Sequence, residues 1–289
     1  MESTKTEPII PTGKTKSPVP NATSASKPVA KKTEPIAKPE PAKKTKAIVP
    51  VHLFGQCANM EEILKIAKQH NLFVIEDNAQ GIGADYISKD GSRKKSGTIG
   101  HVASTSFFPS KNLGCYGDGG AIFTNDNELA AKMSVIVNHG MKVRYYHDEI
   151  GVNSRLDSIQ AAILRIKLRN LDQYNTNRNA AATAYSTAFA DREDVQTPAL
   201  AENSTHVFHQ YTLRIKGKDR NALQKHLMDK GVPAMIYYPV PMHLQSAYHD
   251  ARYKKGDFSV SEMLMEEVIS LPMHSELEDD QIELITSSV

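Results

Sequence analysis

Several features that would assign the protein to a class at once are missing from its sequence. Among 289 residues there is no Trp, and the only two cysteines, Cys57 and Cys115, exclude a disulfide framework and give no zinc-ligand spacing. No apolar run approaches the roughly 18 residues needed to cross a bilayer, and the N-terminus has no apolar segment typical of a secretory signal. We therefore expect a cytoplasmic protein with no metal site and no membrane partner.

The common nucleotide-binding and metalloprotease motifs are missing as well. The Gly81-Ile82-Gly83 segment lacks the third glycine of the dinucleotide-binding fingerprint and does not open a helix after a strand. The chain contains neither a GxxxxGKS or GxxxxGKT phosphate loop nor an HExxH motif. These absences exclude the most recognisable nucleotide-dependent and zinc-dependent enzymes.

Charge is unevenly distributed along the chain. The net charge is +2, but residues 1–46 hold ten Lys and four Glu, which gives +6 there and leaves −4 for the rest. The same residues hold 8 of the 15 prolines and no aromatic side chain, so they cannot bury enough apolar surface to fold. We interpret residues 1–43 as a disordered, Pro/Lys-rich tail. It is a solvated leader or, less favoured, a weak contact for nucleic acid or anionic lipid; we expect no nucleic-acid partner for the body.

The body begins near residue 44 with the pattern of a parallel sheet. A short apolar run over 47–54, one-face helical spacing over 60–70 and a second apolar run over 72–75 predict a strand–helix–strand unit. Further strands are expected at 103–108 and 121–124, and a helix at 127–137 capped by Asp126 or Asn127. One long helix is expected over 155–189. The pattern predicts an α/β domain over residues 44–177.

The pattern changes in the remaining third of the chain. Alternating apolar residues over 206–215 predict a half-buried antiparallel strand. A helix over 219–230, a short strand over 234–238 and two helices over 259–270 and 278–286 follow. We therefore expect a smaller α+β domain over residues 178–289.

Two side chains at expected strand ends could carry chemistry. Asp77 follows an apolar strand, where it could bind a metal, a ribose or a protonated ring nitrogen, or simply cap the next segment. Lys111 lies between an apolar strand and a Gly-rich turn, where a lowered pKa could make it an amine nucleophile. It could equally be a solvated loop lysine. The residues alone predict no more than an α/β protein with an Asp and a Lys at strand ends.

Three segments together carry a resemblance to a known family. These are Glu76-Asp77-Asn78-Ala79-Gln80, the SFFPSKNLG segment of residues 106–114 with GDGGA after it, and GVNSRLDSIQAA of residues 151–162. In this order they resemble the sugar aminotransferases of the DegT/DnrJ/EryC1/StrS family. The resemblance implies a fold-type I large domain, truncated at its N-terminus, with a smaller C-terminal α+β domain. It also implies pyridoxal 5′-phosphate (PLP) as cofactor and a homodimer with shared active sites.

The resemblance assigns roles in cofactor binding to five residues. Lys111 would form a Schiff base with the PLP aldehyde, and Asp77 would keep the pyridine nitrogen protonated, so that the ring acts as an electron sink. Gln80 would contact the ring face or the phenolic oxygen, and Ser106 would bind the phosphate. Asn153 would reach the phosphate in the neighbouring subunit.

The resemblance also implies a reaction and a substrate class. Glutamate would leave its amino group on the cofactor, a UDP-linked keto-sugar would accept it, and Lys111 would be the general base. Segments around residues 144–155 are most similar to the subgroup that aminates UDP-linked 3-keto-hexuronic acids for O-antigen or related polysaccharides. There Arg155 would pair with the sugar carboxylate. Four further residues would line the nucleotide-sugar cleft: His209, Tyr237, Tyr238 and His243.

One departure from the family pattern favours a second hypothesis. Family members carry a Gly-Thr or Gly-Ser loop, before the point where the match begins, that cradles the PLP phosphate. Residues 1–46 contain no such segment. We therefore expect a truncated family fold and keep the alternative of a non-catalytic remnant or interaction protein.

Overall fold

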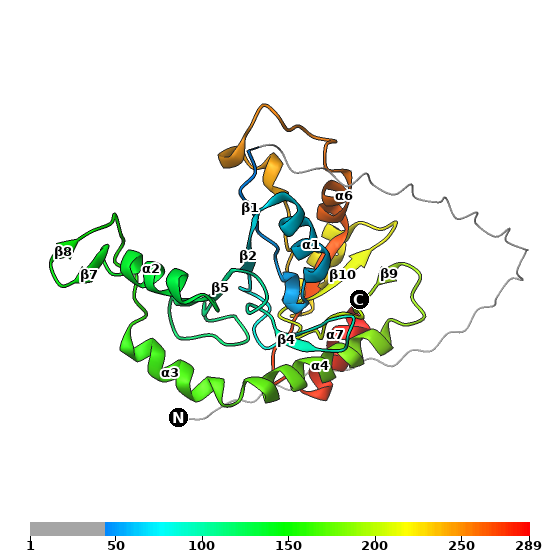
Figure 1. The fold of residues 1–289 in the computed structure, drawn as a ribbon. Coiled ribbons are helices and arrows are strands. Elements are labelled where there is room, and N and C mark those ends of the chain that lie inside the picture. The colour runs from blue at the N-terminus through cyan, green and yellow to red at the C-terminus, as the bar shows by residue number, and fades with distance from the viewer. Residues whose placement is uncertain (1–43) are drawn as a thin grey trace, which may run out of the picture. The chain divides into compact units, whose positions relative to one another are not determined.

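Residues 44–289 form two larger sheets and two short hairpins in the computed structural model (Figure 1). The predicted tail, residues 1–43, lies outside the described residues. Each larger sheet contributes to its own apolar core. Residues 44–289 contain a further apolar cluster, formed by Phe107, Leu113, Cys115, Leu164 and Leu171.

The first sheet contains the strands that end at the candidate site. It has the order β1-β2-β5-β6, with β1 (Ala47–Ile48), β2 (Phe73–Asp77), β5 (Val102–Ser106) and β6 (Gly120–Phe123). β1, β2 and β5 are parallel, and β6 runs antiparallel to β5. The carboxyl ends of β2 and β5 therefore meet at one edge of the sheet. The expected α/β fold with a mostly parallel sheet is confirmed.

Helix α1 (Met60–His70) packs on β1 and β2, as its apolar spacing predicts. It buries Met60 and Ala67 in a cluster with Val74 of β2. Along β2 the buried residues alternate with exposed ones, so Val74 and Glu76 share the covered face. Burying one such apolar side chain contributes about 1.5–3 kcal/mol, which fixes the face that β2 presents to the helix.

The segments around this sheet are held by local caps and hairpins. Helix α2 (Asn127–Val137) begins after Asp126, whose carboxylate accepts the amides of Glu128 and Leu129, as predicted. Two hairpins project from the sheet connections: β3 (Asp85–Ile87) with β4 (Arg93–Lys95), and β7 (Met141–Val143) with β8 (Tyr146–His147).

The long helix expected over 155–189 is wrong, because the structure has two helices there. α3 (Ser158–Leu168) and α4 (Leu171–Ala188) are separated at Asn170, whose backbone leaves the helical conformation. The Asn170 side chain donates back to the Ile166 carbonyl at 3.3 Å, a bond that competes with continued helix. The predicted domain boundary at residues 177/178 falls inside α4 and stays a prediction.

The second sheet is antiparallel and has the order β11-β10-β9. Its strands are β9 (Val195–Gln196), β10 (Tyr211–Ile215) and β11 (Val268–Leu271). Helices α5 (Arg220–Asp229), α6 (Ser259–Glu267) and α7 (Asp279–Ser288) and the end of α4 surround it. Its core includes Tyr185, Tyr211 and Leu213, all fully buried.

Two expected strands are shorter than predicted. The strand over 47–54 ends at Ile48, since Pro50 has no amide hydrogen for a ladder and residues Leu53–Gly55 form a short 3-10 helix, η1, with Phe54 at φ 58°. The strand over 206–215 begins only at Tyr211, because Phe208 at φ 42° interrupts the extended backbone.

Two further expectations in the last third of the chain are wrong. Residues 234–238 form no strand; only Met235 makes an isolated bridge, to Ser270, and the flanking Pro233 and Pro239 cannot donate to a ladder. The helix over 259–270 ends at Glu267, and β11 takes over because pairing with β10 overrides the helical spacing. Two 3-10 helices lie between, η2 (Met242–Leu244) and η3 (Ser246–Tyr248).

Candidate active site

Lys111 lies in the loop after β5 and lines a cavity of about 470 Å³. Its backbone amide donates to the Phe108 carbonyl at 2.9 Å, which closes a turn around it. Burial lowers the pKa of the Lys111 ammonium, and the charge of Asp77 acts in the opposite direction. The neutral amine, the form that attacks carbonyl carbon, is therefore more accessible than for a lysine in water.

Asp77 is the last residue of β2, at the position expected from the sequence. Its backbone is fixed on both sides: the amide donates to the Pro50 carbonyl at 2.8 Å, and the carbonyl accepts the His52 amide at 3.0 Å. Its carboxylate accepts the Ala79 amide at 3.0 Å. The negative charge of Asp77 acts on the pKa of Lys111, but Asp77 is not among the residues that line the Lys111 cavity.

At this cavity, the Gln80 side chain is hydrogen-bonded to two segments that lie far apart in the sequence. Its Oε1 accepts the Phe54 amide at 2.6 Å, and its Nε2 donates to the Tyr238 hydroxyl at 3.3 Å. Tyr237 also lines the cavity, with its ring centroid 5.5 Å from that of Tyr238. Three residues that the sequence placed at the site therefore meet around Lys111.

The cavity wall also contains Ser106 and three residues that sequence reasoning missed. The Ser106 hydroxyl oxygen accepts the Phe108 amide at 3.2 Å and lies at the end of β5. Phe108, Ser110 and Gln210 complete the lining. Ser110 and Gln210 are direct neighbours of Lys111 and His209, so their position in the chain was the available signal.

His209 is buried beside Lys111, with 5% of its surface exposed. Burial lowers the pKa of its imidazole to about 3, and the positive charges of Lys111 and Arg178 add to the effect. Its Nδ1 has no hydrogen-bond partner among residues 44–289. His209 therefore enters the cavity wall as a neutral imidazole with unused hydrogen-bonding capacity.

Asn112 fixes the loop that carries Lys111. Its side-chain Nδ2 donates to the Asn175 side-chain oxygen on α4 and to the Val207 carbonyl, both at 2.8 Å. Asn112 lies in the SFFPSKNLG segment of residues 106–114, but the resemblance assigns it no role, because a single Asn in a Gly-rich turn is like any polar loop residue. The hydrogen bonds tie the loop to a helix and to the segment before His209.

Three consecutive carbonyls of that segment accept side-chain donors. Asn179 donates to the His206 carbonyl at 2.9 Å, Asn112 to the Val207 carbonyl at 2.8 Å, and Arg178 to the Phe208 carbonyl at 3.0 Å. A strand ladder would otherwise satisfy such groups. α4 and the Lys111 loop therefore position residues 206–208, and with them His209.

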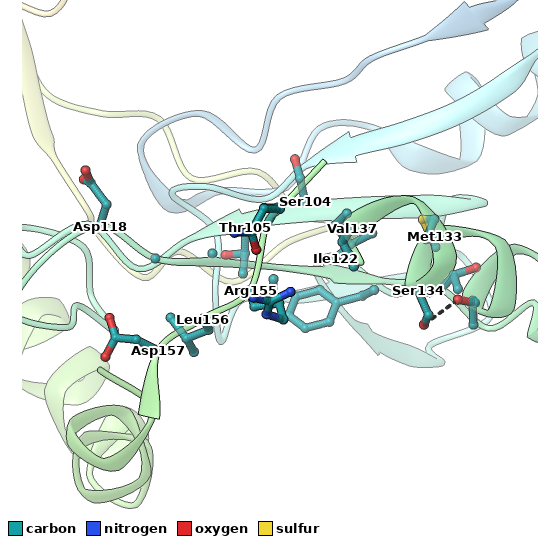
Figure 2. A pocket seen from close by; sticks show the side chains of 18 residues that line it. Ser104, Thr105, Asp118, Ile122, Met133, Ser134, Val137, Arg155, Leu156 and Asp157 are labelled. Carbon is teal, nitrogen blue, oxygen red and sulfur yellow. Dashed lines mark hydrogen bonds between the residues drawn. The ribbon is translucent and has the colours of Figure 1, made fainter. Parts of the chain in front are cut away.

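Asn153 and Arg155 lie at a second, larger cavity of about 980 Å³ (Figure 2). It is bordered by β5, β6, α2 and residues 153–157. The Arg155 guanidinium donates to the Asn138 side chain at 3.2 Å and lies 3.4 Å from His139 Nε2. Within one chain the structure therefore does not bring Asn153 or Arg155 into the Lys111 cavity.

His243 also lies away from the wall around Lys111. Its Nε2 is hydrogen-bonded to the Glu262 carboxylate of α6 at 2.9 Å, and only 8% of its side chain is exposed. The ring packs on Phe258, with centroids 4.7 Å apart. His243 thus joins residues 242–244 to α6 rather than facing the Lys111 cavity.

No group of three or more His, Cys, Asp or Glu side chains among residues 44–289 is placed to hold a metal ion. No helix formed by these residues is long and apolar enough to cross a membrane.

Comparison with known proteins decides the family. Residues 37–289 match the model of the DegT/DnrJ/EryC1/StrS aminotransferase family. The chain belongs to this family. The family membership confirms the resemblance seen in the three segments and the fold-type I class, and it supports PLP as the cofactor.

Individual members of the DegT/DnrJ/EryC1/StrS family show how much of the fold is shared. A pleiotropic regulatory protein of Geobacillus stearothermophilus is 47% identical over 85% of this chain and 65% of its own length. UDP-2-acetamido-2-deoxy-3-oxo-D-glucuronate aminotransferase of Pseudomonas aeruginosa is 43% identical over 85% of this chain and 66% of its own length. The chain spans less than two thirds of the first of these relatives and about two thirds of the second.

A solved family structure has the same backbone arrangement. DesV of S. venezuelae, in complex with a ketimine intermediate, superimposes with a TM-score of 0.80 at 39% identity. The match covers 86% of this chain and 65% of that one. The sheet that carries Asp77 and Lys111 is therefore part of an established family architecture.

Proposed function

We propose that the protein uses PLP to move an amino group from glutamate to a UDP-linked keto-sugar, specifically a 3-keto-hexuronic acid. The observation that carries the proposal is the half-buried amine of Lys111, whose pKa is lowered by burial, in a cavity that Gln80 and Ser106 also line. A 43% identical relative is named for a UDP-linked 3-oxo-glucuronate. That name supports the sugar class.

The side chains that line the Lys111 cavity, together with Asp77 at the end of β2, fit PLP in their chemistry. The Lys111 amine suits an aldehyde, the Asp77 carboxylate a protonated ring nitrogen, and the Ser106 hydroxyl a phosphate oxygen. Gln80, fixed from both ends, would contact the ring or its phenolic oxygen. When bound, PLP supplies an electron sink for the negative charge that develops at the substrate carbon.

The residues of the chain would then bind, orient and move protons. Asp77 would keep the proton on the ring nitrogen, because its carboxylate is held at the end of β2. Lys111 Nζ would take a proton from the substrate carbon and return it to the cofactor carbon, a step that burial favours by making the neutral amine accessible. His209 would remain neutral in this process and offer a hydrogen bond to the substrate.

A homodimer with shared sites would complete the arrangement. Asn153 and Arg155 lie at a cavity apart from Lys111 within one chain, so a second subunit would be needed to bring them to a cofactor. There Asn153 would contact the phosphate, and Arg155 would bind the sugar carboxylate through two parallel hydrogen bonds. Tyr237 and Tyr238, which line the Lys111 cavity, would contact the nucleotide-sugar.

A non-catalytic interaction protein is the second candidate. It is favoured by the name of the 47% identical relative, a pleiotropic regulatory protein. It would retain the fold without the chemistry of Lys111.

One spectroscopic experiment separates the two functions. The full chain is purified with PLP, and a visible absorbance band of cofactor joined to Lys111 is expected, together with its bleaching by glutamate. Borohydride should fix the cofactor to Lys111, and Lys111→Ala should abolish the band. A chain that gives no band, and no cofactor on Lys111 after borohydride, would exclude the aminotransferase.

A further inference from the structure

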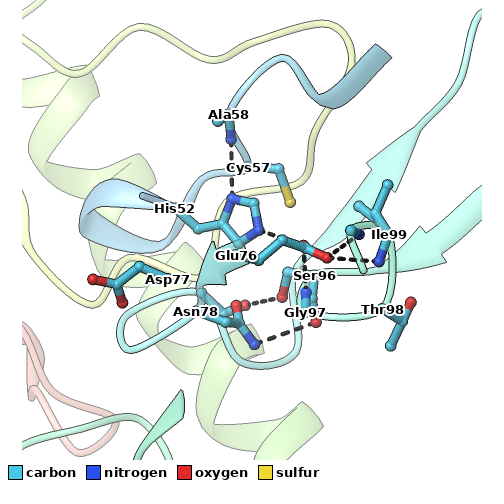
Figure 3. A network of polar contacts seen from close by, with 12 residues as sticks. His52, Cys57, Ala58, Glu76, Asp77, Asn78, Ser96, Gly97, Thr98 and Ile99 are labelled. Carbon is cyan, nitrogen blue, oxygen red and sulfur yellow. Dashed lines mark hydrogen bonds and ion pairs between the residues drawn. The ribbon is translucent and has the colours of Figure 1, made fainter. Parts of the chain in front are cut away.

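Directly before Asp77, a carboxylate is buried with a full set of donors (Figure 3). Glu76 has no exposed surface. Its oxygens accept hydrogen bonds from His52 Nε2 at 2.7 Å, from the Gly97 amide at 2.8 Å and from the Ile99 amide at 2.7 Å. A fourth bond comes from the Gly100 amide. Burial raises the pKa of Glu76, but these donors outweigh it and hold the pKa below its usual value.

His52 contacts both Glu76 and the backbone of Asp77. Its backbone amide donates to the Asp77 carbonyl at 3.0 Å while its ring bonds to the Glu76 carboxylate. The ring Nδ1 accepts the Ala58 amide at 3.2 Å. Because Nδ1 is an acceptor, the proton of the neutral ring is on Nε2, which makes Nε2 the donor to Glu76.

The same short segment supports the other expected ring contact. Two residues after His52, the Phe54 amide donates to Gln80 Oε1 at 2.6 Å. Two residues before it, the Pro50 carbonyl accepts the Asp77 amide at 2.8 Å. Residues 50–54 therefore hold both Asp77 and Gln80, and the His52–Glu76 bond ties this segment to β2 by side chains.

We propose that His52 and Glu76 are positioning residues, which set the carboxylate of Asp77 and the amide of Gln80 for the cofactor; this rests on the proposed function. Glu76 and Asp77 are consecutive in β2 and point to opposite faces. A rotation of the strand that moves Glu76 out of its donor set therefore moves Asp77 on the other face as well. Neither His52 nor Glu76 touches the cofactor in this arrangement.

Two substitutions of His52 make a matched pair. His52→Gln places an amide nitrogen near the position of Nε2 and can still donate to Glu76. His52→Asn is shorter: it can accept the Ala58 amide at the position of Nδ1, but it cannot reach Glu76. If the hydrogen bond from position 52 to Glu76 positions Asp77, the two variants should differ in PLP affinity and in amide exchange. If only packing is lost, the two variants should behave alike.

The test uses the full chain and two readouts. We expect His52→Asn to weaken PLP binding about tenfold, measured by absorbance titration, because one oxygen of the buried Glu76 carboxylate loses its hydrogen-bond donor. His52→Gln should stay within about twofold of the parent. Amide hydrogen exchange in residues 77–80 of the cofactor-free chain should be faster in His52→Asn and unchanged in His52→Gln.

The outcomes separate this inference from the proposed function. Equal PLP affinities for the two variants, or equal exchange in residues 77–80, would overturn the positioning role, whatever their thermal stabilities. A parent chain that binds no PLP would remove the proposed function. In that case, faster exchange in His52→Asn alone would still support the positioning of Asp77 by His52 and Glu76. Equal exchange in the two variants would overturn that positioning role.

Discussion

The side-chain amide of Asn112 donates a hydrogen bond to the side-chain oxygen of Asn175, 63 residues away on α4, at 2.8 Å. Asn112 directly follows Lys111. The bond therefore joins the loop that carries the candidate nucleophile to helix α4. Both side chains are buried. A buried polar pair of this kind costs stability when only one partner is removed.

Asn112→Ala is expected to lower the free energy of unfolding by about 1–3 kcal/mol, because it leaves the Asn175 oxygen and the Val207 carbonyl without their donor. Urea denaturation would measure the loss. Asn177→Ala is the matched control on the same helix: its exposed amide donates to the Ser275 carbonyl at 3.0 Å. That control should change stability by less than about 0.5 kcal/mol. Equal losses in the two variants would contradict the special role of Asn112.

His206 should make the stability of the protein dependent on pH. Its Nδ1 accepts the Phe208 amide at 2.9 Å, and burial lowers the pKa of its imidazole to about 4. The unfolded chain, with a pKa near 6.5, binds a proton first as the pH falls. The stabilising contribution is therefore complete above pH 6.5 and is lost between pH 6.5 and 4.

Lowering the pH from 7 to 5 should cost about 2 kcal/mol from His206 alone. His209, whose pKa is lowered to about 3, adds a loss of the same sign. Urea unfolding of the parent and of His206→Gln at several pH values would measure the slopes. The variant should show the shallower slope, and parallel slopes would show that His206 is not buried neutral.

The proposed homodimer with shared sites can be tested by a complementation experiment. Lys111→Ala and Asn153→Ala chains should each lack a complete site. After the two are mixed and allowed to exchange subunits, half of the dimers are mixed, and each contains one complete site. Recovery of about one quarter of the parent transaminase rate is expected. No recovery, in a mixture whose mixed dimers are detected by mass, would place Asn153 outside the site of the partner.

Arg155 should act on the sugar carboxylate and not on the amino donor. Arg155→Ala is expected to raise the KM for the UDP-linked amino-uronic acid in the reverse reaction about tenfold or more, because a bidentate charged contact is lost. The KM for 2-oxoglutarate should change little. Arg165→Ala, an exposed arginine on α3, serves as control. Equal effects on both KM values would remove Arg155 from sugar recognition.

The sequence allowed prediction of elements whose signals are local. Helix α1 follows its apolar spacing, and α2 begins at the Asp126 cap, since both signals lie within a few residues. The break at Asn170 and the change from α6 to β11 at Val268 were missed. The first rests on a single side-chain bond, and the second on pairing with a strand more than fifty residues earlier in the chain.

The residues of the candidate site also fall into two groups, those that local sequence predicts and those that it does not. Asp77, Gln80, Ser106 and Lys111 lie in motifs, and each motif follows a strand of one sheet, so their meeting could be anticipated. The supporting roles of Asn112 and His52 could not be predicted, although Asn112 lies in a motif segment, because their partners are side-chain and backbone oxygens that only folding brings near. The position of His243 beside Glu262 depends on a loop and a helix that no local pattern connects.

The donors around Glu76 have a consequence for how position 76 can change over time. Three of the four are main-chain amides of residues 97, 99 and 100, which no substitution other than one to proline removes. Any replacement at position 76 must therefore satisfy a fixed ring of backbone hydrogens, and only a side chain with two acceptor oxygens at the length of glutamate does so. The side chain at position 52 has to satisfy one main-chain donor, the Ala58 amide, against three at position 76. In related sequences, variation should be tolerated at 52 before it is tolerated at 76.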